Sequence, residues 1–169
     1  MSHPLAFSKS KVSRRTYCAR LALGFSSVLG LAHLEAIAAP AQLPASVSLP
    51  DELENAYKAK EPLIVMVSLA GCPYCKMARD SYLGPMQKQG FPIVQVDMRS
   101  EQPVKAISGQ IRTHDQLVKQ WRVSIAPTLL FLGPKGQELV DRMEGGYLPD
   151  FYGAYLEERI LAARKSLRG

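Results

Sequence analysis

The sequence predicts an α/β fold in which a central mixed β-sheet is flanked by helices on both faces. The run from Leu63 to Leu69 is continuously apolar and rich in β-branched residues, which is typical of a strand buried on both faces. Predicted strands and helices then alternate, and a β-hairpin and a closing helix follow them. This order favours one sheet that contains both parallel and antiparallel neighbours.

The first 38 residues are predicted to form a cleavable export signal. A basic stretch without acids precedes the modestly apolar residues 21–34. Ala36 and Ala38 then supply the small residues that a signal peptidase requires, so we place cleavage after Ala38. An uncleaved anchor or an amphipathic helix is the alternative. The paired arginines Arg14 and Arg15 permit twin-arginine export, but the match to that motif is imperfect and general secretion is favoured.

The formal net charge of +6 belongs mostly to this segment. Without residues 1–38, which hold five basic residues and one acid, 16 basic and 14 acidic residues remain, a net charge of +2. This balance does not indicate a nucleic-acid partner. No stretch is long and apolar enough to predict a membrane span with confidence.

The cysteine content indicates redox chemistry. Cys18 leaves with the signal, so the exported chain keeps only Cys72 and Cys75. A disulfide between them closes a very short loop and would add little stability, which makes an inert structural bridge the less favoured reading. Structural zinc needs about four ligands, and attached c-type haem needs histidine where Lys76 stands. We therefore expect no metal site and no cofactor other than the redox-active pair itself.

The elements of the first half follow from local patterns. Residues 39–50 contain three prolines and predict a linker, so the domain is expected to span residues 51–169. A helix should begin at Asp51, with Leu53, Ala56 and Tyr57 on its apolar face. A second helix is predicted after the strand, from Cys75 to Leu83, with an interruption at Gly84 and Pro85. The strand Ile93–Asp97 comes next.

The second half begins with the polar residues 99–112, which predict an insertion or a short hairpin. Thr113 is placed to cap a helix that ends near Trp121. The strands Thr128–Leu132 and Glu138–Met143 flank a Gly-Pro-Lys-Gly turn. The last helix is expected from Pro149 to about Ser166. Its predicted apolar face comprises Phe151, Tyr155, Leu156, Ile160 and Leu161.

The spacing of the cysteines suits a dithiol that exchanges disulfides. Cys72 falls at the junction of a strand and a helix, where unpaired backbone N–H groups favour negative charge. That position lowers a cysteine pKa, so Cys72 is expected to be the attacking thiolate. Cys75 lies one turn further and should resolve the mixed disulfide. Pro73 and Tyr74 set the geometry and polarity of the loop between them.

These residues resemble the thioredoxin superfamily over about residues 51–165. The resemblance rests on the apolar strand, the Gly-Cys-Pro-Tyr-Cys-Lys motif, and Ala126-Pro127-Thr128 ahead of another apolar strand. It implies the thioredoxin fold and a thiol–disulfide oxidoreductase activity. It also implies a cis Pro127 beside the cysteines, with Ala126 and Pro127 lining the groove where substrate docks.

The predicted signal, the polar insertion at residues 99–112 and the Gly-Gly-Tyr-Leu-Pro sequence of residues 145–149 are similar to those of exported thioredoxins of the SoxW type. The predicted signal and this resemblance together imply a periplasmic protein that reduces protein disulfides. We also expect a monomer that a membrane-bound thiol donor keeps reduced. Two features depart from the superfamily pattern. Met66 stands where cytosolic thioredoxins carry a buried acid, and Cys-Pro-Tyr-Cys is usual in glutaredoxins, although glutathione use is not favoured here.

The alternative function is a non-enzymatic module that captures Cu(I) through both thiolates. The sequence also leaves the direction of exchange open, because reductases and oxidases share the motif and differ in redox potential. Of the other polar or aromatic residues, Trp121 is expected to pack in the core and Asp97 to be a turn residue. His114 is expected at the solvated surface, and Lys76 either supports the thiolate or is simply exposed.

Overall fold

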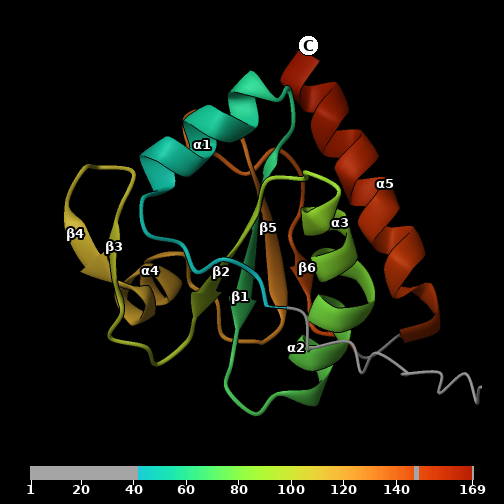
Figure 1. The fold of residues 1–169 in the computed structure, drawn as a ribbon, viewed down its shortest axis with the longest axis horizontal. Coiled ribbons are helices and arrows are strands. Elements are labelled where there is room, and N and C mark those ends of the chain that lie inside the picture. The colour runs from blue at the N-terminus through green and yellow to red at the C-terminus, as the bar shows by residue number, and fades with distance from the viewer. Residues whose placement is uncertain (1–41, 147–148, 169) are drawn as a thin grey trace, which may run out of the picture. The chain divides into compact units, whose positions relative to one another are not determined.

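The computed structural model describes residues 42–146 and 149–168, and the predicted signal, residues 1–38, lies outside this part. Figure 1 shows the elements of the domain. They are α1 (Leu49–Lys58), β1 (Leu63–Ser68), α2 (Pro73–Ala78), the π-helical turn η1 (Arg79–Leu83), α3 (Gly84–Lys88), β2 (Ile93–Asp97), β3 (Pro103–Lys105), β4 (Ile111–Thr113), α4 (His114–Gln120), β5 (Thr128–Leu132), β6 (Met143–Glu144) and α5 (Pro149–Arg168).

The main sheet is mixed, as the sequence predicts. Its strand order is β2-β1-β5-β6. Strand β1 is parallel to β2 and antiparallel to β5, and β6 is antiparallel to β5. All six residues of β1 are buried. The central position of this strand explains why its sequence is continuously apolar instead of alternating.

Helices cover both faces of the sheet, which confirms the predicted fold class (Figure 1). Side chains of successive strand residues point to opposite faces. Leu63, Val65 and Val67 of β1 belong to a core cluster with α1 and α4. Ile64 and Met66 belong to a second cluster with α2, η1 and α5. The cysteine-bearing helix therefore shares its face of the sheet with the C-terminal helix.

The predicted linker is wrong for residues 43–50, which are part of the fold. The backbone of Gln95 in β2 donates to the carbonyl of Pro44 and accepts from the N–H of Ser46, each over 2.8 Å. Helix α1 begins at Leu49, which is fully buried. The three prolines conceal this pairing, because a proline-rich segment can still add backbone hydrogen bonds to an edge strand.

The predicted interruption at Gly84 and Pro85 is wrong. The helix that follows Cys72 continues through both residues to Lys88. The π-helical turn η1 precedes Pro85, and the N–H of Gly84 donates to the carbonyl of Arg79 within it. A proline has no N–H for the regular helical ladder. The wider turn accommodates it, so the helix extends where sequence patterns predict an end.

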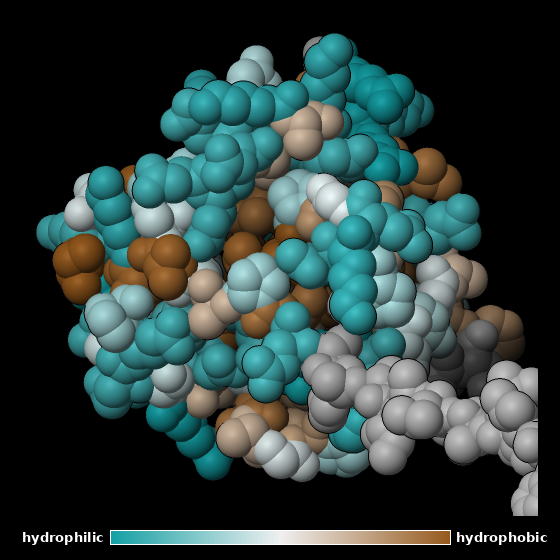
Figure 2. All heavy atoms as spheres, in the orientation of Figure 1, coloured by the Kyte–Doolittle hydropathy of each residue, from teal (hydrophilic) through white to brown (hydrophobic). Residues whose placement is uncertain are grey.

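Residues 99–112 supply a small hairpin, which was one of the two expected forms. Strands β3 and β4 pair antiparallel in a separate two-stranded sheet. Ile107 and Ile111 are exposed there, and Figure 2 shows apolar side chains over this hairpin. Thr113 caps α4 as predicted, since its side chain accepts from the N–H of Gln116 and the Gln116 side chain accepts from the N–H of Thr113.

The predicted strand Glu138–Met143 is wrong, because the pairing with β5 is interrupted. Glu138 forms an isolated bridge with Leu132, and regular pairing resumes only at Met143 with a register shifted by two residues. Leu139 and Val140 are consecutive, yet both pack against the cluster that contains α5. A regular strand cannot direct two successive side chains to one face, so the chain leaves the ladder between them.

Helix α5 has the predicted start but a different buried face. Its buried stripe is formed by Tyr152, Leu156, Ile160 and Ala163. Phe151, Tyr155 and Leu161, which were expected to be buried, are exposed. In α1, Tyr57 is likewise exposed.

Among residues 42–146 and 149–168, no helix has the length and apolar character needed to cross a membrane.

His114 is buried in the structure, so the expected surface position is wrong. Its side chain has no solvent exposure. The N–H of Asp97 donates to Nδ1 over 3.0 Å, so Nε2 carries the proton and donates to the carbonyl of Ser46 over 2.9 Å. The ring thus joins β2 to the N-terminal segment. Trp121 packs against the core cluster of α1 and α4, as predicted.

Replacing His114 with alanine should destabilise the domain by about 2–4 kcal/mol, because it leaves a cavity and two unpaired buried backbone groups. Urea unfolding followed by circular dichroism measures the loss. Lys119→Ala on the exposed side of the same helix is the control and should leave the free energy of unfolding nearly unchanged. Equal stabilities of the two variants would contradict the role of His114.

Candidate active site

Three residues connect the carboxyl end of β1 to the cysteine motif. Gly71 has a φ of +75°, a left-handed conformation that favours glycine, and it turns the chain from the strand into the helix. The N–H of Cys72 donates to the carbonyl of Leu69 over 3.2 Å and closes this turn. Cys72 is the N-cap of α2, and Pro73 occupies the first turn, where its missing N–H costs nothing.

The Cys72 sulfur occupies the position of a capping side chain. It accepts a hydrogen bond from the N–H of Cys75 over 3.1 Å. The thiol also faces the carbonyl oxygen of Ala126 at 3.6 Å. Cys72 is partly exposed and Cys75 is buried, and the two thiols are not linked. The structure therefore presents a dithiol in which only the first sulfur is accessible.

The environment of Cys75 keeps this thiol protonated. Burial, together with the hydrogen bond that the Cys75 thiol donates to the Cys72 sulfur, raises the pKa of Cys75 to about 11. Hydrogen bonds from the backbone of Leu69 and from the hydroxyl of Ser68 act in the opposite direction and lower that pKa. At neutral pH the Cys75 thiol is consequently a poor nucleophile, since the thiolate is the reactive form.

The loop opposite the cysteines is held rigidly. The peptide bond between Ala126 and Pro127 is cis, which is the geometry expected from the sequence context. The N–H of Gly145 donates to the carbonyl of Pro127 over 2.7 Å, and the hydroxyl of Thr128 donates to the carbonyl of Ile125 over 2.8 Å. These bonds fix the Ala126 carbonyl beside Cys72.

Gly146 is a site residue that the sequence patterns did not reveal. A Cβ atom at this position would lie 3.1 Å from the Cβ of Tyr74, 3.5 Å from Met77 and 3.6 Å from Pro127. The backbone at Gly146 therefore packs against both the motif helix and the cis-proline loop. Two adjacent glycines have no local feature that distinguishes such a packing position from a simple break between elements.

Two exposed apolar side chains accompany the accessible sulfur. Tyr74 follows Cys72 by two residues and is 48% exposed, and Ile125 precedes Ala126 and is 49% exposed. Lys76, by contrast, forms an ion pair with Asp80 one turn along the helix and is itself exposed. The lysine is thus engaged away from the thiols, as one of its two sequence interpretations expected.

A cleft of about 790 Å³ lies beside the motif. Cys72 lines it, as do the polar side chains of Ser68, Arg79, Gln95 and Asp97. Ser68 and Arg79 were not recognised in the sequence, because nothing local marks a serine at the end of a strand or an arginine in a helix. Within the described residues, no group of three or more His, Cys, Asp or Glu side chains could hold a metal ion.

The structure thus brings together Cys72, Cys75 and Ala126, and it places Tyr74 and Pro127 against Gly146. The catalytic and groove roles that the sequence assigns to them, and to Pro73, stay predictions. The mixed sheet, the cysteine pair at the end of its central strand and the cis-proline loop define a thioredoxin-fold protein with a dithiol site.

Comparison with known proteins agrees with this class. A family model described as thioredoxin-like domain matches residues 49–160. The chain belongs to this thioredoxin-like domain family. No curated protein matches the chain.

Several solved structures match the chain at low sequence identity. A structure described as DsbH oxidoreductase is 23% identical, with a TM-score of 0.49, and the match covers 75% of this chain and 88% of that one. A thioredoxin from Thermus thermophilus is 22% identical, with a TM-score of 0.47, covering 74% and 91%. Thioredoxin NaTrxh from Nicotiana alata is 17% identical, with a TM-score of 0.45, covering 75% and 98%.

The difference between the two thiols predicts selective alkylation. Iodoacetamide at pH 7 should modify Cys72 in the reduced protein and leave Cys75 free, because Cys75 is buried and its pKa is raised to about 11. Labelling of Cys75 should increase as the pH approaches that value. Peptide mass spectrometry measures both sites. The protein unfolded in concentrated urea is the control, in which both should react, and equal labelling of the folded protein at pH 7 would contradict the assignment.

Proposed function

We propose that this protein is an exported thiol–disulfide oxidoreductase that reduces disulfide bonds of other proteins in the periplasm. The observation that carries the proposal is the asymmetry of the pair. Cys72 is an accessible helix-capping sulfur, and Cys75 is a buried thiol whose N–H contacts that sulfur at 3.1 Å. An exchange enzyme needs one thiol that attacks and a second that acts only after the first has reacted.

In the proposed reaction, the Cys72 thiolate attacks a substrate disulfide and releases one substrate sulfur as a thiolate, which takes up a proton. Cys75 then attacks the sulfur of Cys72 in the mixed disulfide and releases the second substrate sulfur. Two electrons pass from the dithiol to the substrate, and Cys72 and Cys75 end as a disulfide. The chemistry needs no cofactor besides this pair.

The groove of the proposed enzyme suits an extended protein segment. The exposed Tyr74 and Ile125 offer apolar contacts near the accessible sulfur. Ala126 and Pro127 would form the wall on the other side, with Pro73 shaping the loop. The family resemblance implies that substrate backbone docks against this wall, and such docking would favour a protein disulfide over a small disulfide compound.

The remaining parts of the proposal rest on the sequence. The signal-like residues 1–38 support export, by general secretion in preference to the twin-arginine route. The resemblance to SoxW-type proteins supports a periplasmic location and a membrane-bound thiol donor that keeps the pair reduced. We further propose that the protein acts as a monomer. The small net charge of the exported chain supports protein substrates and not nucleic acid.

Cysteine variants test the proposal directly. Cys72→Ser should abolish dithiothreitol-driven insulin reduction, because the attacking thiol is lost. Cys75→Ser should accumulate mixed disulfides between Cys72 and substrate, which non-reducing gels and mass spectrometry detect. The double variant is the control and should trap nothing. Undiminished insulin reduction by Cys72→Ser would contradict the proposed chemistry.

The direction of exchange is tested by a redox titration of the Cys72–Cys75 pair against glutathione or dithiothreitol buffers. A reductase should have a potential near that of thioredoxin, about −270 mV. Alkylation of free thiols followed by mass spectrometry gives the reduced fraction at each buffer ratio. A value near about −120 mV would instead indicate a protein that forms disulfides.

A further inference from the structure

Resolution of the mixed disulfide requires a thiolate at a buried position. Cys75 is 1% exposed and lies in an apolar cluster with Ile64 and Met66 of β1. Those two strand residues share the face of the sheet that Cys75 packs against, and neither can donate a hydrogen bond. Ser68 is the next residue on the same face of β1, and its side chain is buried as well.

The hydrogen bond from Arg79 occupies the oxygen of the Ser68 hydroxyl and leaves the hydroxyl O–H available to donate to Cys75. The Nη2 atom of Arg79 donates to the Ser68 hydroxyl oxygen over 2.9 Å. An arginine has donors only, so the serine oxygen must be the acceptor in this bond. Cys75 and Arg79 lie one turn apart on the same side of the motif helix, so the serine that Arg79 contacts also lies beneath Cys75. The single O–H of Ser68 is then free to donate to the Cys75 sulfur, and this interaction lowers the pKa of Cys75.

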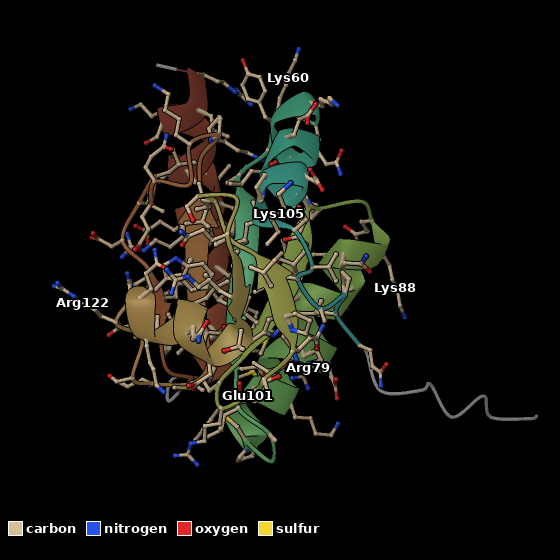
Figure 3. All side chains as sticks on the ribbon, turned by 90° about the vertical axis from the view of Figure 1, so that its left-hand side faces the viewer. Lys60, Arg79, Lys88, Glu101, Lys105 and Arg122 are labelled. Carbon is tan, nitrogen blue, oxygen red and sulfur yellow. The ribbon has the colours of Figure 1, made fainter. Side chains whose placement is uncertain are left out.

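Arg79 is itself held in position from the neighbouring strand. Its Nε donates to the side-chain oxygen of Gln95 over 3.0 Å, and the Gln95 amide donates to Asp97 over 2.7 Å. Among the described residues, no carboxylate lies within ion-pair distance of Arg79. No ion pair therefore engages its positive charge, which is linked to the buried sulfur through Ser68 by two successive hydrogen bonds. Figure 3 labels Arg79 beside the helical segment that follows Cys72.

We propose that Ser68 is a catalytic residue that donates a hydrogen bond to the Cys75 thiolate during resolution, and that Arg79 is the positioning residue that orients and polarises Ser68. The inference deepens the proposed function and rests on it. In this step the Cys75 sulfur bonds to Cys72, the bond between Cys72 and the substrate sulfur breaks, and the proton lost by Cys75 is balanced by one that the departing substrate thiolate takes up.

The backbone N–H of Leu69 also donates to the Cys75 sulfur, whatever side chain stands at position 68, and among the described side chains Ser68 alone does so. Tyr152 of α5 belongs to the same buried cluster as Cys75, and burial, with a smaller contribution from Cys75, raises the pKa of its phenol. Its hydroxyl has no hydrogen-bond partner among the described residues, so it does not bond to the Cys75 sulfur. Cys72 is consumed in the mixed disulfide at this stage. Ser68, backed by the charge of Arg79, is thus the side-chain donor available to the forming thiolate.

The test uses 5,5′-dithiobis(2-nitrobenzoate), a coloured disulfide, on the reduced full-length protein. Attack by Cys72 releases one thionitrobenzoate, and resolution by Cys75 releases the second. Ser68→Ala should slow the second release about tenfold at pH 7 and leave the first release unchanged. The slowing is expected because loss of the hydrogen bond raises the pKa of Cys75 and makes its thiolate about tenfold scarcer. The slowing should vanish at a pH above the pKa of Cys75, where the thiolate forms without help.

Two further variants keep the test decisive. Arg79→Gln changes a partly exposed side chain outside the core and should slow the second release several-fold. Ser46→Ala is the matched control, because it removes another buried serine hydroxyl, bonded to Glu52 away from the thiols. It should leave both releases unchanged.

The outcomes separate this inference from the proposed function. A second release that is unchanged in Ser68→Ala, or slowed equally at every pH, would overturn the role of Ser68 and leave the dithiol chemistry intact. A wild-type protein that never makes the second release would overturn the proposed function itself, and with it the inference. A pH-dependent slowing in Ser68→Ala and Arg79→Gln alone would support both.

Discussion

Strand β1 determines where the two cysteines can lie. It is hydrogen-bonded on both edges, to β2 and β5, and buried on both faces. Such a strand cannot shift its register without moving buried side chains to the wrong face. The chain that leaves it is therefore delivered at a fixed point, where Gly71 turns it into the helix and Cys72 becomes the N-cap.

The contrast between the thiols follows from this geometry. A helix that begins directly after Cys72 directs unpaired N–H groups at its sulfur, and that of Cys75 makes the contact. The same helical turn carries Cys75 inward, against the apolar face of the sheet. One sulfur is thus solvated by backbone donors at the surface, while the other is desolvated. Three residues of separation suffice to produce both environments.

The sequence predicted the elements and residues that local patterns determine. The apolar run of β1, the cysteine spacing and the cap at Thr113 each depend on a few neighbouring residues. His114 and the segment 43–50 could not be placed, because their hydrogen bonds reach partners such as Ser46 and Gln95 that are distant in the chain. Ser68 and Arg79 were missed for the same reason, since their contact exists only after the helix packs on the sheet.

A polar side chain at Ser68 is not required by the fold. Ile64 and Met66 occupy the preceding positions on the same face, so an apolar residue at Ser68 would continue the pattern of the core. Burying a hydroxyl is unfavourable unless its hydrogen bonds are made, and a hydrogen bond to an ionised group contributes about 1.5–3 kcal/mol. The bonds of Ser68 are made on one side by Arg79 and on the other by Cys75, and only the second of these becomes stronger when a thiolate forms. The arrangement therefore stabilises the reacting state of Cys75 more than its resting state, which is the property that accelerates a chemical step.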